Sequence, residues 1–165
     1  MDEFSAGIIT VSDKGSRGER VDASGPIIEE MIKKIEGRVE KYIIVPDEKQ
    51  DIKEAIIEMS DNLGLNLILT TGGTGFSKRD VTPEATLEVI ERRAPGIPEA
   101  MRARSMQITP KAMLSRSEAG IRKQTLIINL PGSPKGVREN LEIILPALKH
   151  GIEILIGQAS ECGGK

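Results

Sequence analysis

Short apolar runs alternate with amphipathic helical patterns along most of the chain, and this alternation constrains the fold more than any other feature. Four runs are β-branched or leucine-rich and have the length of buried strands: residues 6–11, 39–45, 65–70 and 125–130. Between them, apolar side chains recur every three or four residues over 27–35 and 52–63, which is typical of helices with one buried face. Because right-handed crossovers place helices on both faces of a parallel sheet, the sequence predicts a three-layer α/β/α fold with a mostly parallel sheet.

The C-terminal part of the chain carries one further amphipathic face. Its apolar positions follow helical spacing: Val137, Leu141, Ile144, Leu145 and Leu148. Pro146 lies within this pattern, so we expect it to kink or end the helix. Residues 152–156 would then form a terminal turn or a short separate helix.

Residues 92–123 form the least regular part of the chain and carry much of its positive charge. Four residues that disrupt helices divide this stretch, which predicts short helices and loops: Pro95, Gly96, Pro98 and Pro110. It holds eight basic and two acidic residues, a net charge of +6, whereas the rest of the chain carries −8. The stretch could face an anion or an acidic neighbouring subunit, and a solvated basic surface is the alternative.

Composition excludes several classes of protein. At roughly 150 residues per domain, the 165 residues predict a single domain over 1–165. The net charge is −2, and the chain has one Tyr, two Phe and no Trp, so it lacks the basic surface and stacking aromatics of a nucleic-acid binder, and we expect no nucleic-acid partner. Cys162 is the only cysteine, and the sequence has neither an 18-residue apolar run nor a signal sequence, which predicts a cytoplasmic protein without a membrane partner.

The strongest local signal follows the third apolar run, where residues 70–75 are Thr-Thr-Gly-Gly-Thr-Gly. Glycines accept positive φ and let the backbone approach a ligand, while consecutive N–H groups and threonine hydroxyls can bind an anion. Thr82 is expected to cap the next helix, with Pro83 at its first position. A tight turn without a ligand is the alternative, but such a turn rarely needs three glycines and two flanking threonines.

Polar loops also follow the other three runs. They contain Ser12 and Asp13 after the first run, Asp47 after the second, and Ser133 after the fourth, where Ser133 is expected to cap a helix that begins at Pro134. Taken singly, each has an ordinary interpretation as a loop, an Asx turn or a capped helix start. In an open parallel sheet, however, ligands bind beyond the carboxyl ends of the strands, so the four loops together predict a shared pocket for a polyanion.

The side chains of the sequence limit the chemistry open to it. Lys78 stands where the last glycine of a G-x-G-x-x-G motif starting at Gly73 would be, and no G-x-x-x-x-G-K-[ST] motif occurs, which argues against hydride transfer and P-loop hydrolysis. With one His and one Cys, neither a histidine-based triad nor a Cys/His zinc site can be assembled within one chain. Carboxylates, hydroxyls, Arg and Lys remain, and these suit phosphoryl or nucleotidyl transfer assisted by Mg²⁺.

Seven short motifs spread over the chain occur together in one known family. They are Thr-Val-Ser-Asp at 10–13, Asp-Ala-Ser-Gly-Pro at 22–26, Val-Pro-Asp at 45–47, Thr-Thr-Gly-Gly-Thr-Gly at 70–75, Arg-Asp-Val-Thr-Pro-Glu-Ala at 79–85, Ala-Met-Leu-Ser-Arg at 112–116, and Leu-Pro-Gly-Ser-Pro-Lys at 130–135. With these motifs the chain resembles the Mog/MoaB family of molybdenum-cofactor biosynthesis proteins, and it is similar to the G domain of gephyrin. The resemblance implies a Rossmann-like molybdopterin-binding domain.

The resemblance also implies a nucleotidyltransferase, namely a molybdopterin adenylyltransferase. Such an enzyme transfers AMP from Mg-ATP to the terminal phosphate of molybdopterin and releases pyrophosphate. Asp47 and Asp80 match the two aspartates regarded as essential in the family; the resemblance places Asp80 on Mg²⁺ and Asp47 at the reacting phosphate or the pterin, although these roles could be exchanged. The implied substrate-binding residues are Ser12, Asp13, Thr71, Gly72, Gly73, Thr74, Gly75, Ser115, Arg116, Pro131, Gly132 and Ser133.

The resemblance leaves the oligomeric state and two functional alternatives open. Proteins of the Mog type form homotrimers and many of the MoaB type form hexamers, so we expect a homotrimer, with a hexamer as the alternative. A non-catalytic MoaB-type paralogue that binds molybdopterin is the first functional alternative. The second is an oligomeric scaffold, in the manner of gephyrin's structural role.

Overall fold

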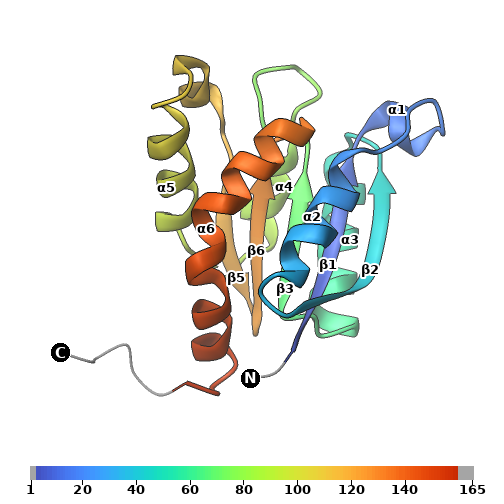
Figure 1. Ribbon diagram of the computed structural model, residues 1–165. Coiled ribbons are helices and arrows are strands. Elements are labelled where there is room, and N and C mark those ends of the chain that lie inside the picture. Colours follow the sequence, from blue (N-terminus) through green and yellow to red (C-terminus); the bar gives the residue numbers. More distant parts are fainter. Residues whose placement is uncertain (1–2, 160–165) are drawn as a thin grey trace.

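The computed structural model describes residues 3–159 and shows one sheet covered by helices on both faces (Figure 1). The six strands are β1 (Phe4–Val11), β2 (Gly37–Val45), β3 (Leu67–Thr71), β4 (Arg92–Arg93), β5 (Ala119–Arg122) and β6 (Thr125–Leu130). Their order across the sheet is β2-β1-β3-β6-β5-β4. The first four strands of this order are parallel, whereas β5 is antiparallel to β6 and β4 is antiparallel to β5. The predicted three-layer α/β/α fold with a mostly parallel sheet is confirmed.

Alternate residues of the central strands fill two hydrophobic clusters, one on each face of the sheet. The first cluster joins the sheet to α2 (Ser24–Lys33), α5 (Gly96–Ser105) and α6 (Pro134–Leu155). The second joins it to α3 (Lys49–Ile57), a π-helical turn η1 (Glu58–Asn62) and α4 (Thr82–Val89). Leu67 and Leu69 of β3 belong to the first cluster and Ile68 to the second, as the two-residue period of a strand requires. Both faces of the parallel strands are therefore buried, which explains why these strands are continuous apolar runs in the sequence.

The four predicted strands are confirmed, with ends that differ by at most two residues. The prediction of only short helices and loops for 92–123 is wrong in part. The stretch does contain α5 and a 3₁₀ turn, η2 (Pro110–Leu114), but it also contributes β4 and β5. With two and four residues, these strands are too short for an alternating pattern to stand out, and they form the antiparallel edge of the sheet.

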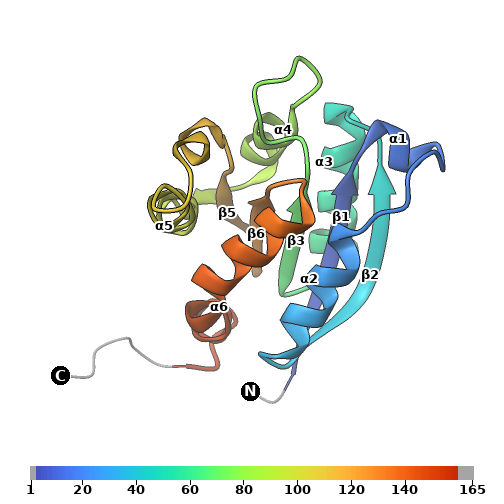
Figure 2. The same cartoon turned by 45° about the horizontal axis from the view of Figure 1, so that its top comes forward.

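Helix α6 is longer than the sequence predicts. Pro146 lies inside it rather than at its end, and residues 152–155 belong to the same helix instead of a separate turn. Proline removes one backbone hydrogen bond from a helix interior. The helix continues because its buried face extends across the proline, from Val137 to Ile152. Its two halves point in different directions in Figure 2, as expected of a proline kink.

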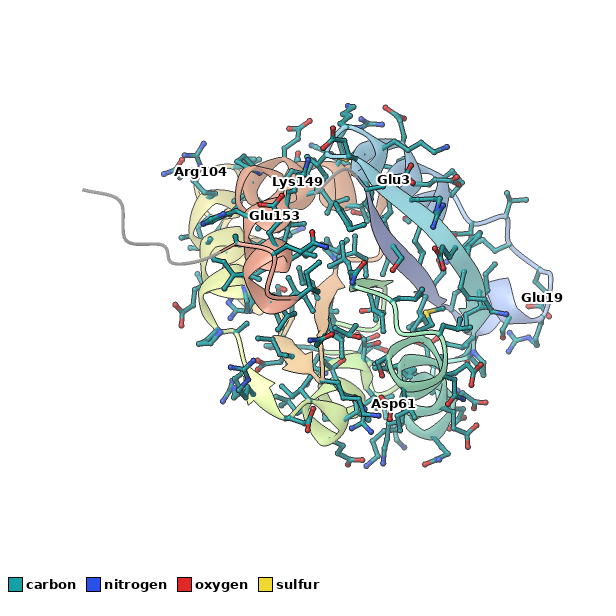
Figure 3. All side chains as sticks on the ribbon, turned by 90° about the horizontal axis from the view of Figure 1, so that it is seen from below. Glu3, Glu19, Asp61, Arg104, Lys149 and Glu153 are labelled. Carbon is teal, nitrogen blue, oxygen red and sulfur yellow. The ribbon has the colours of Figure 1, made fainter. Side chains whose placement is uncertain are left out.

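The view from below separates the apolar layers from the charged surface (Figure 3). Labelled charged residues such as Glu19, Asp61 and Arg104 lie around the outside of the three layers. Within residues 3–159, no helix combines the length and the apolar character needed to cross a membrane. Cys162 and the two ends of the predicted domain 1–165 lie outside the described residues.

Candidate functional site

The carboxyl ends of the four parallel strands lie in one row, as the strand register shows. Val11 pairs with Val45, Thr10 with Thr71, and Thr71 with Leu130. The loops that follow these strands therefore meet at one edge of the sheet, at the top of Figure 1.

These loops surround a first cavity of about 590 Å³. Nine residues of the predicted site line it: Ser12, Asp13, Asp47, Thr71, Gly72, Gly73, Asp80, Gly132 and Ser133. The four polar loops that the sequence singles out thus share one pocket, and both aspartates of the predicted pair face it.

The glycine loop adopts a conformation that requires glycine. Gly72 and Gly73 have φ values of +99° and +69°, which residues with a Cβ rarely adopt. A Cβ on Gly72 would collide with the carbonyl oxygen of Val11, and a Cβ on Gly73 would collide with the hydroxyl of Thr82. The loop therefore passes close to β1 and α4, with its backbone exposed to the cavity instead of side chains.

Hydroxyl groups fasten the glycine loop to its neighbours. The buried Thr82 hydroxyl donates to the carbonyl oxygen of Gly72 at 2.9 Å, and the Thr71 hydroxyl donates to the carbonyl oxygen of Pro131 at 2.7 Å. The expectation that Thr82 caps α4 is wrong, because Val81 occupies the cap position and Thr82 is the first helical residue. The loops after β3 and β6 are thus joined by side chains as well as by the sheet.

Asp13 and Asp47 join the loops after β1 and β2 by two reciprocal hydrogen bonds. The backbone N–H of Asp13 donates to Asp47 Oδ2 at 2.9 Å, and the backbone N–H of Asp47 donates to Asp13 Oδ1 at 3.0 Å. Arg79 also donates to both carboxylate oxygens of Asp13, at 2.9 and 3.0 Å. The hydrogen bonds from Arg79 and from the Asp47 backbone lower the pKa of Asp13, so Asp13 is an ionised structural partner here.

Asp47 and Asp80 differ from Asp13 because neither forms an ion pair with a cation of the described residues. Burial raises the pKa of Asp47, and the negative charges of Asp13 and Asp80 raise it further. Asp80 accepts a hydrogen bond from the backbone N–H of Ser77 at 2.9 Å. The cavity therefore presents two carboxylates that form no ion pair within residues 3–159.

This carboxylate pair fits Mg²⁺ better than it fits a metal held by protein side chains alone. No group of three His, Cys, Asp or Glu side chains in the described part of the chain is arranged to hold a metal ion. Mg²⁺ in phosphate-transferring sites is commonly bound by one or two carboxylates, with water and substrate phosphates as the other ligands. Asp47 and Asp80 are the residues available to hold it.

A fourth acidic residue, Asp22, lines the same cavity as Asp13, Asp47 and Asp80 and is missing from the predicted site. Burial alone would raise its pKa, but hydrogen bonds from Tyr42, from Thr10 and from two backbone N–H groups outweigh this and lower it. Burial and the bond to Asp22 raise the pKa of Tyr42 to about 12. Asp22 also holds the start of α2, where the Ser24 hydroxyl donates to the carbonyl oxygen of Gly132 at 2.8 Å. Its hydrogen bonds give Asp22 a structural role.

Two basic residues at the same cavity are also missing from the prediction. Lys14 lies in the one-turn helix α1 (Asp13–Ser16) that follows β1, Arg20 lies in the loop after that helix, and both line the pocket. Their sequence signal is weak, because an exposed loop commonly carries lysine and arginine. They add positive charge to a pocket whose other charged residues are aspartates.

A second cavity of about 590 Å³ lies beside the first, with Ser133 lining both. Four more residues of the predicted site line it: Thr74, Gly75, Ser115 and Pro131. Its basic side chains are Arg102, Lys111 and Lys135, and the first two belong to the stretch with a net charge of +6. Part of the basic stretch 92–123 therefore faces a cavity, which is the arrangement expected if this stretch binds an anion.

Arg116, the remaining residue of the predicted site, lines neither of these two cavities. Its guanidinium donates to the carbonyl oxygens of Gly75 and Asp80, at 2.8 and 2.7 Å, and pairs with Glu84. Arg116 therefore links the two ends of the loop 75–80 to each other and to α4. It supports the loop that carries Asp80, and its contact with substrate stays a prediction.

The fold and site together define a class of protein. At its carboxyl edge the open parallel sheet carries a glycine loop, several basic side chains and two carboxylates that form no ion pair in the described part of the chain. These are the features of an α/β protein that binds phosphorylated ligands. Residues 7–150 match the family model described as a probable molybdopterin binding domain, and the chain belongs to this family.

Individual relatives agree with this assignment. The chain is 48% identical over 164 residues to gephyrin of Dictyostelium discoideum, an alignment that covers 93% of this chain but 23% of that protein. It is 40% identical over 167 residues to the molybdopterin adenylyltransferase of Helicobacter pylori strain J99, covering 100% of this chain and 95% of the relative. The crystal structure of the molybdopterin biosynthesis enzyme MoaB from Thermus thermophilus matches with a TM-score of 0.90 and 49% identity, over 96% of this chain and 99% of that one. The predicted resemblance to the Mog/MoaB family is confirmed.

Proposed function

We propose that this protein is a molybdopterin adenylyltransferase, which transfers AMP from Mg-ATP to the terminal phosphate of molybdopterin and releases pyrophosphate. The observation that carries the proposal is the position of Asp47 and Asp80, which face one cavity beside the glycine loop and form no ion pair with any cation that the structure describes. The activity named for relatives that this chain matches over most of their length supports it.

The reaction suits a site without a histidine base. An oxygen of the terminal molybdopterin phosphate forms a bond to the α-phosphorus of ATP, and the bond from that phosphorus to the bridging oxygen of pyrophosphate breaks. The attacking phosphate is already ionised at neutral pH, so no proton has to be removed from it. Positioning and neutralisation of charge then supply most of the catalysis.

Each part of the first cavity has a role in this proposal. Asp80 holds Mg²⁺, which when bound neutralises phosphate charge, and Asp47 lies at the reacting phosphate or the pterin; the exchanged assignment is the second form of the same proposal. The N–H groups of the glycine loop and the cations of Lys14 and Arg20 contribute further positive potential towards the phosphates.

Two adjacent cavities suit a reaction with two large substrates. Each has a volume of about 590 Å³, and the loop that carries Ser133 lies between them. Ser133 caps α6 by accepting a hydrogen bond from the backbone N–H of Gly136 at 3.0 Å, so the positive end of this 22-residue helix points to the junction. We propose that ATP and molybdopterin occupy these two cavities, with the reacting phosphates at the junction.

The direct test is incubation of the purified protein with Mg-ATP and molybdopterin, followed by chromatography for adenylylated molybdopterin and pyrophosphate. Equimolar formation of both products by the native chain supports the proposal, and the Asp80→Asn variant serves as the negative control. Tight binding of molybdopterin without product would instead identify a non-catalytic molybdopterin-binding paralogue.

The same proposal covers assembly, compartment and domain organisation. We propose a homotrimer, with a hexamer as the alternative, on the basis of the resemblance to Mog proteins, and light scattering coupled to gel filtration measures the state. We also propose that residues 1–165 act as one domain in the cytoplasm. Cell fractionation tests the compartment.

A further inference from the structure

Arg79 connects three of the four loops that form the first cavity. Its Nε and Nη2 atoms donate to the Asp13 carboxylate at 3.0 and 2.9 Å, and its Nη1 donates to Glu48 at 2.8 Å. Asp13 follows β1 and Glu48 lies in the loop after β2, whereas Arg79 itself lies in the segment that follows β3. One guanidinium therefore bridges loops that are distant in the sequence and that the fold brings together.

The two partners of Arg79 flank Asp47. Asp13 exchanges two hydrogen bonds with Asp47, and Glu48 is the next residue along the chain. A displacement of either partner would therefore move Asp47. Through them, the guanidinium controls where the Asp47 carboxylate lies.

Arg79 is also the residue directly before Asp80. The Asp80 backbone N–H donates to the carbonyl oxygen of Ser77 at 2.9 Å, and the Ser77 N–H donates to the Asp80 carboxylate at the same distance. These two bonds close a tight turn that contains Arg79 in its middle. The backbone of this turn positions Asp80. The side chain of Arg79, in the same turn, binds Asp13 and Glu48, which flank Asp47.

We propose that Arg79 is a positioning residue that fixes the distance between Asp47 and Asp80. Its Nε and both terminal nitrogens already have carboxylate partners, and it does not line the cavity that those two aspartates face. The inference rests on the proposed function, because it gives Arg79 a purpose only if the two carboxylates serve one reaction.

Lysine cannot replace arginine in this role. The arrangement needs a planar fork that binds both oxygens of Asp13 and reaches Glu48 at the same time, whereas a lysine ammonium is a single point charge. The Arg79 side chain is 51% exposed, so its ion pairs contribute little to the free energy of unfolding. Variants at position 79 are therefore expected to fold, which a thermal melt verifies.

The experiment compares Arg79→Lys and Arg79→Gln with Lys78→Gln, which removes a neighbouring exposed charge from the same turn. For both Arg79 variants we expect kcat to fall about 10- to 100-fold, as for other residues that orient metal-binding or catalytic groups, with KM for ATP and molybdopterin changed less than about threefold. Lys78→Gln is expected to keep kcat within about twofold of the native value.

A direct phosphate-binding role for Arg79 gives the opposite pattern. Lysine would then restore most of the activity, because it keeps the charge, and glutamine would raise KM with little change in kcat. Either result overturns the proposal.

A structural readout separates this inference from the proposed function. Crystal structures of the native chain and of Arg79→Lys are expected to differ in the distance between the carboxylates of Asp47 and Asp80. Unchanged carboxylate positions overturn the positioning role even if activity falls. A native protein that makes no adenylylated molybdopterin overturns the proposed function, while the comparison of the two crystal structures still decides the role of Arg79.

Discussion

Thr82 lies so close to Gly73 that residue 73 has no room for a side chain. The hydroxyl of Thr82 lies where a Cβ on Gly73 would be, and the backbone N–H of Thr82 donates to the carbonyl oxygen of Gly73 at 3.1 Å. The same hydroxyl donates to the carbonyl oxygen of Gly72. The start of α4 therefore packs against the glycine loop, and Thr82 binds the carbonyl oxygens of both Gly72 and Gly73.

Substitution of Gly73 by alanine tests this fit. The positive φ and the clash with Thr82 should together lower the free energy of unfolding by about 2–4 kcal/mol, and nucleotide or pterin affinity should fall with it. Gly64→Ala is the matched control, because Gly64 has a φ of +62° but nothing within 4 Å of the added Cβ. It should cost only about 1–2 kcal/mol and leave binding unchanged. Urea unfolding and equilibrium binding measure both effects, and equal costs at the two positions would contradict the proposed clash.

Removal of the Asp80 charge should abolish catalysis while most of the binding site is retained. Asn keeps an oxygen that can accept the hydrogen bond from the Ser77 N–H, so the turn is preserved while the proposed metal ligand is lost. We expect no detectable product from Asp80→Asn and a molybdopterin affinity close to that of the native chain. Asp51→Asn, an exposed change in α3, is the control and should keep full activity. Normal turnover by the Asp80 variant would rule out a metal-binding role for this residue.

The sequence predicts a site residue well when its role depends on neighbouring residues, and poorly when its partners lie far away in the chain. Asp47 and Ser133 could be singled out from local sequence, because Asp47 lies in the short loop after a strand and Ser133 directly precedes a helix. Asp80 is implied by the family resemblance. The loop-holding contacts of Arg79 and Arg116 could not be predicted, since their partners Asp13 and Gly75 lie 66 and 41 residues away in the chain. Only the folded sheet brings these pairs together.

Local patterns also mislead where tertiary contacts compete with them. Thr82 before Pro83 has the sequence of a helix cap, yet its hydroxyl binds a carbonyl ten residues earlier in the chain. The same competition explains β5, where pairing with β6 makes a strand of four residues that have no strong pattern of their own. The parallel core is predictable because burial on both faces demands long apolar runs, and the short edge strands are not.

Asn129 supports the site from beneath and gives a prediction for stability. Its buried amide donates to the hydroxyls of Thr70 and Thr86, and its carbonyl oxygen accepts from the backbone N–H of Glu118. Asn129→Leu leaves these groups without partners in the core and should cost about 2–3 kcal/mol. The exposed Asn62→Leu change in η1 should stay within about 0.5 kcal/mol. Urea denaturation measures the two free energies, and a small effect at Asn129 would show that the hydroxyls find other partners.

The ionised Asp47 carboxylate is expected to lower the free energy of unfolding of the protein. Burial raises the pKa of its carboxyl in the folded state, so the folded protein holds this proton more tightly than the unfolded chain does. Stability is then lost as the pH rises from the unfolded pKa, about 4, through the folded value, and the loss is complete above the folded pKa.

The Asp47→Asn variant removes this cost and still offers an oxygen to the backbone N–H of Asp13. We therefore expect an inactive protein whose Tm at pH 7 equals or exceeds the native value, with the difference shrinking as the pH falls through the folded pKa of Asp47 towards about 4. Comparison of native and variant at each pH cancels the opposite contribution of Asp13, whose lowered pKa makes both proteins less stable in acid. A lower Tm for the variant at pH 7 would mean that the hydrogen bond from the Asp13 backbone N–H and the positive charge of Arg79 outweigh the burial of Asp47, and that the ionised carboxylate stabilises the fold instead.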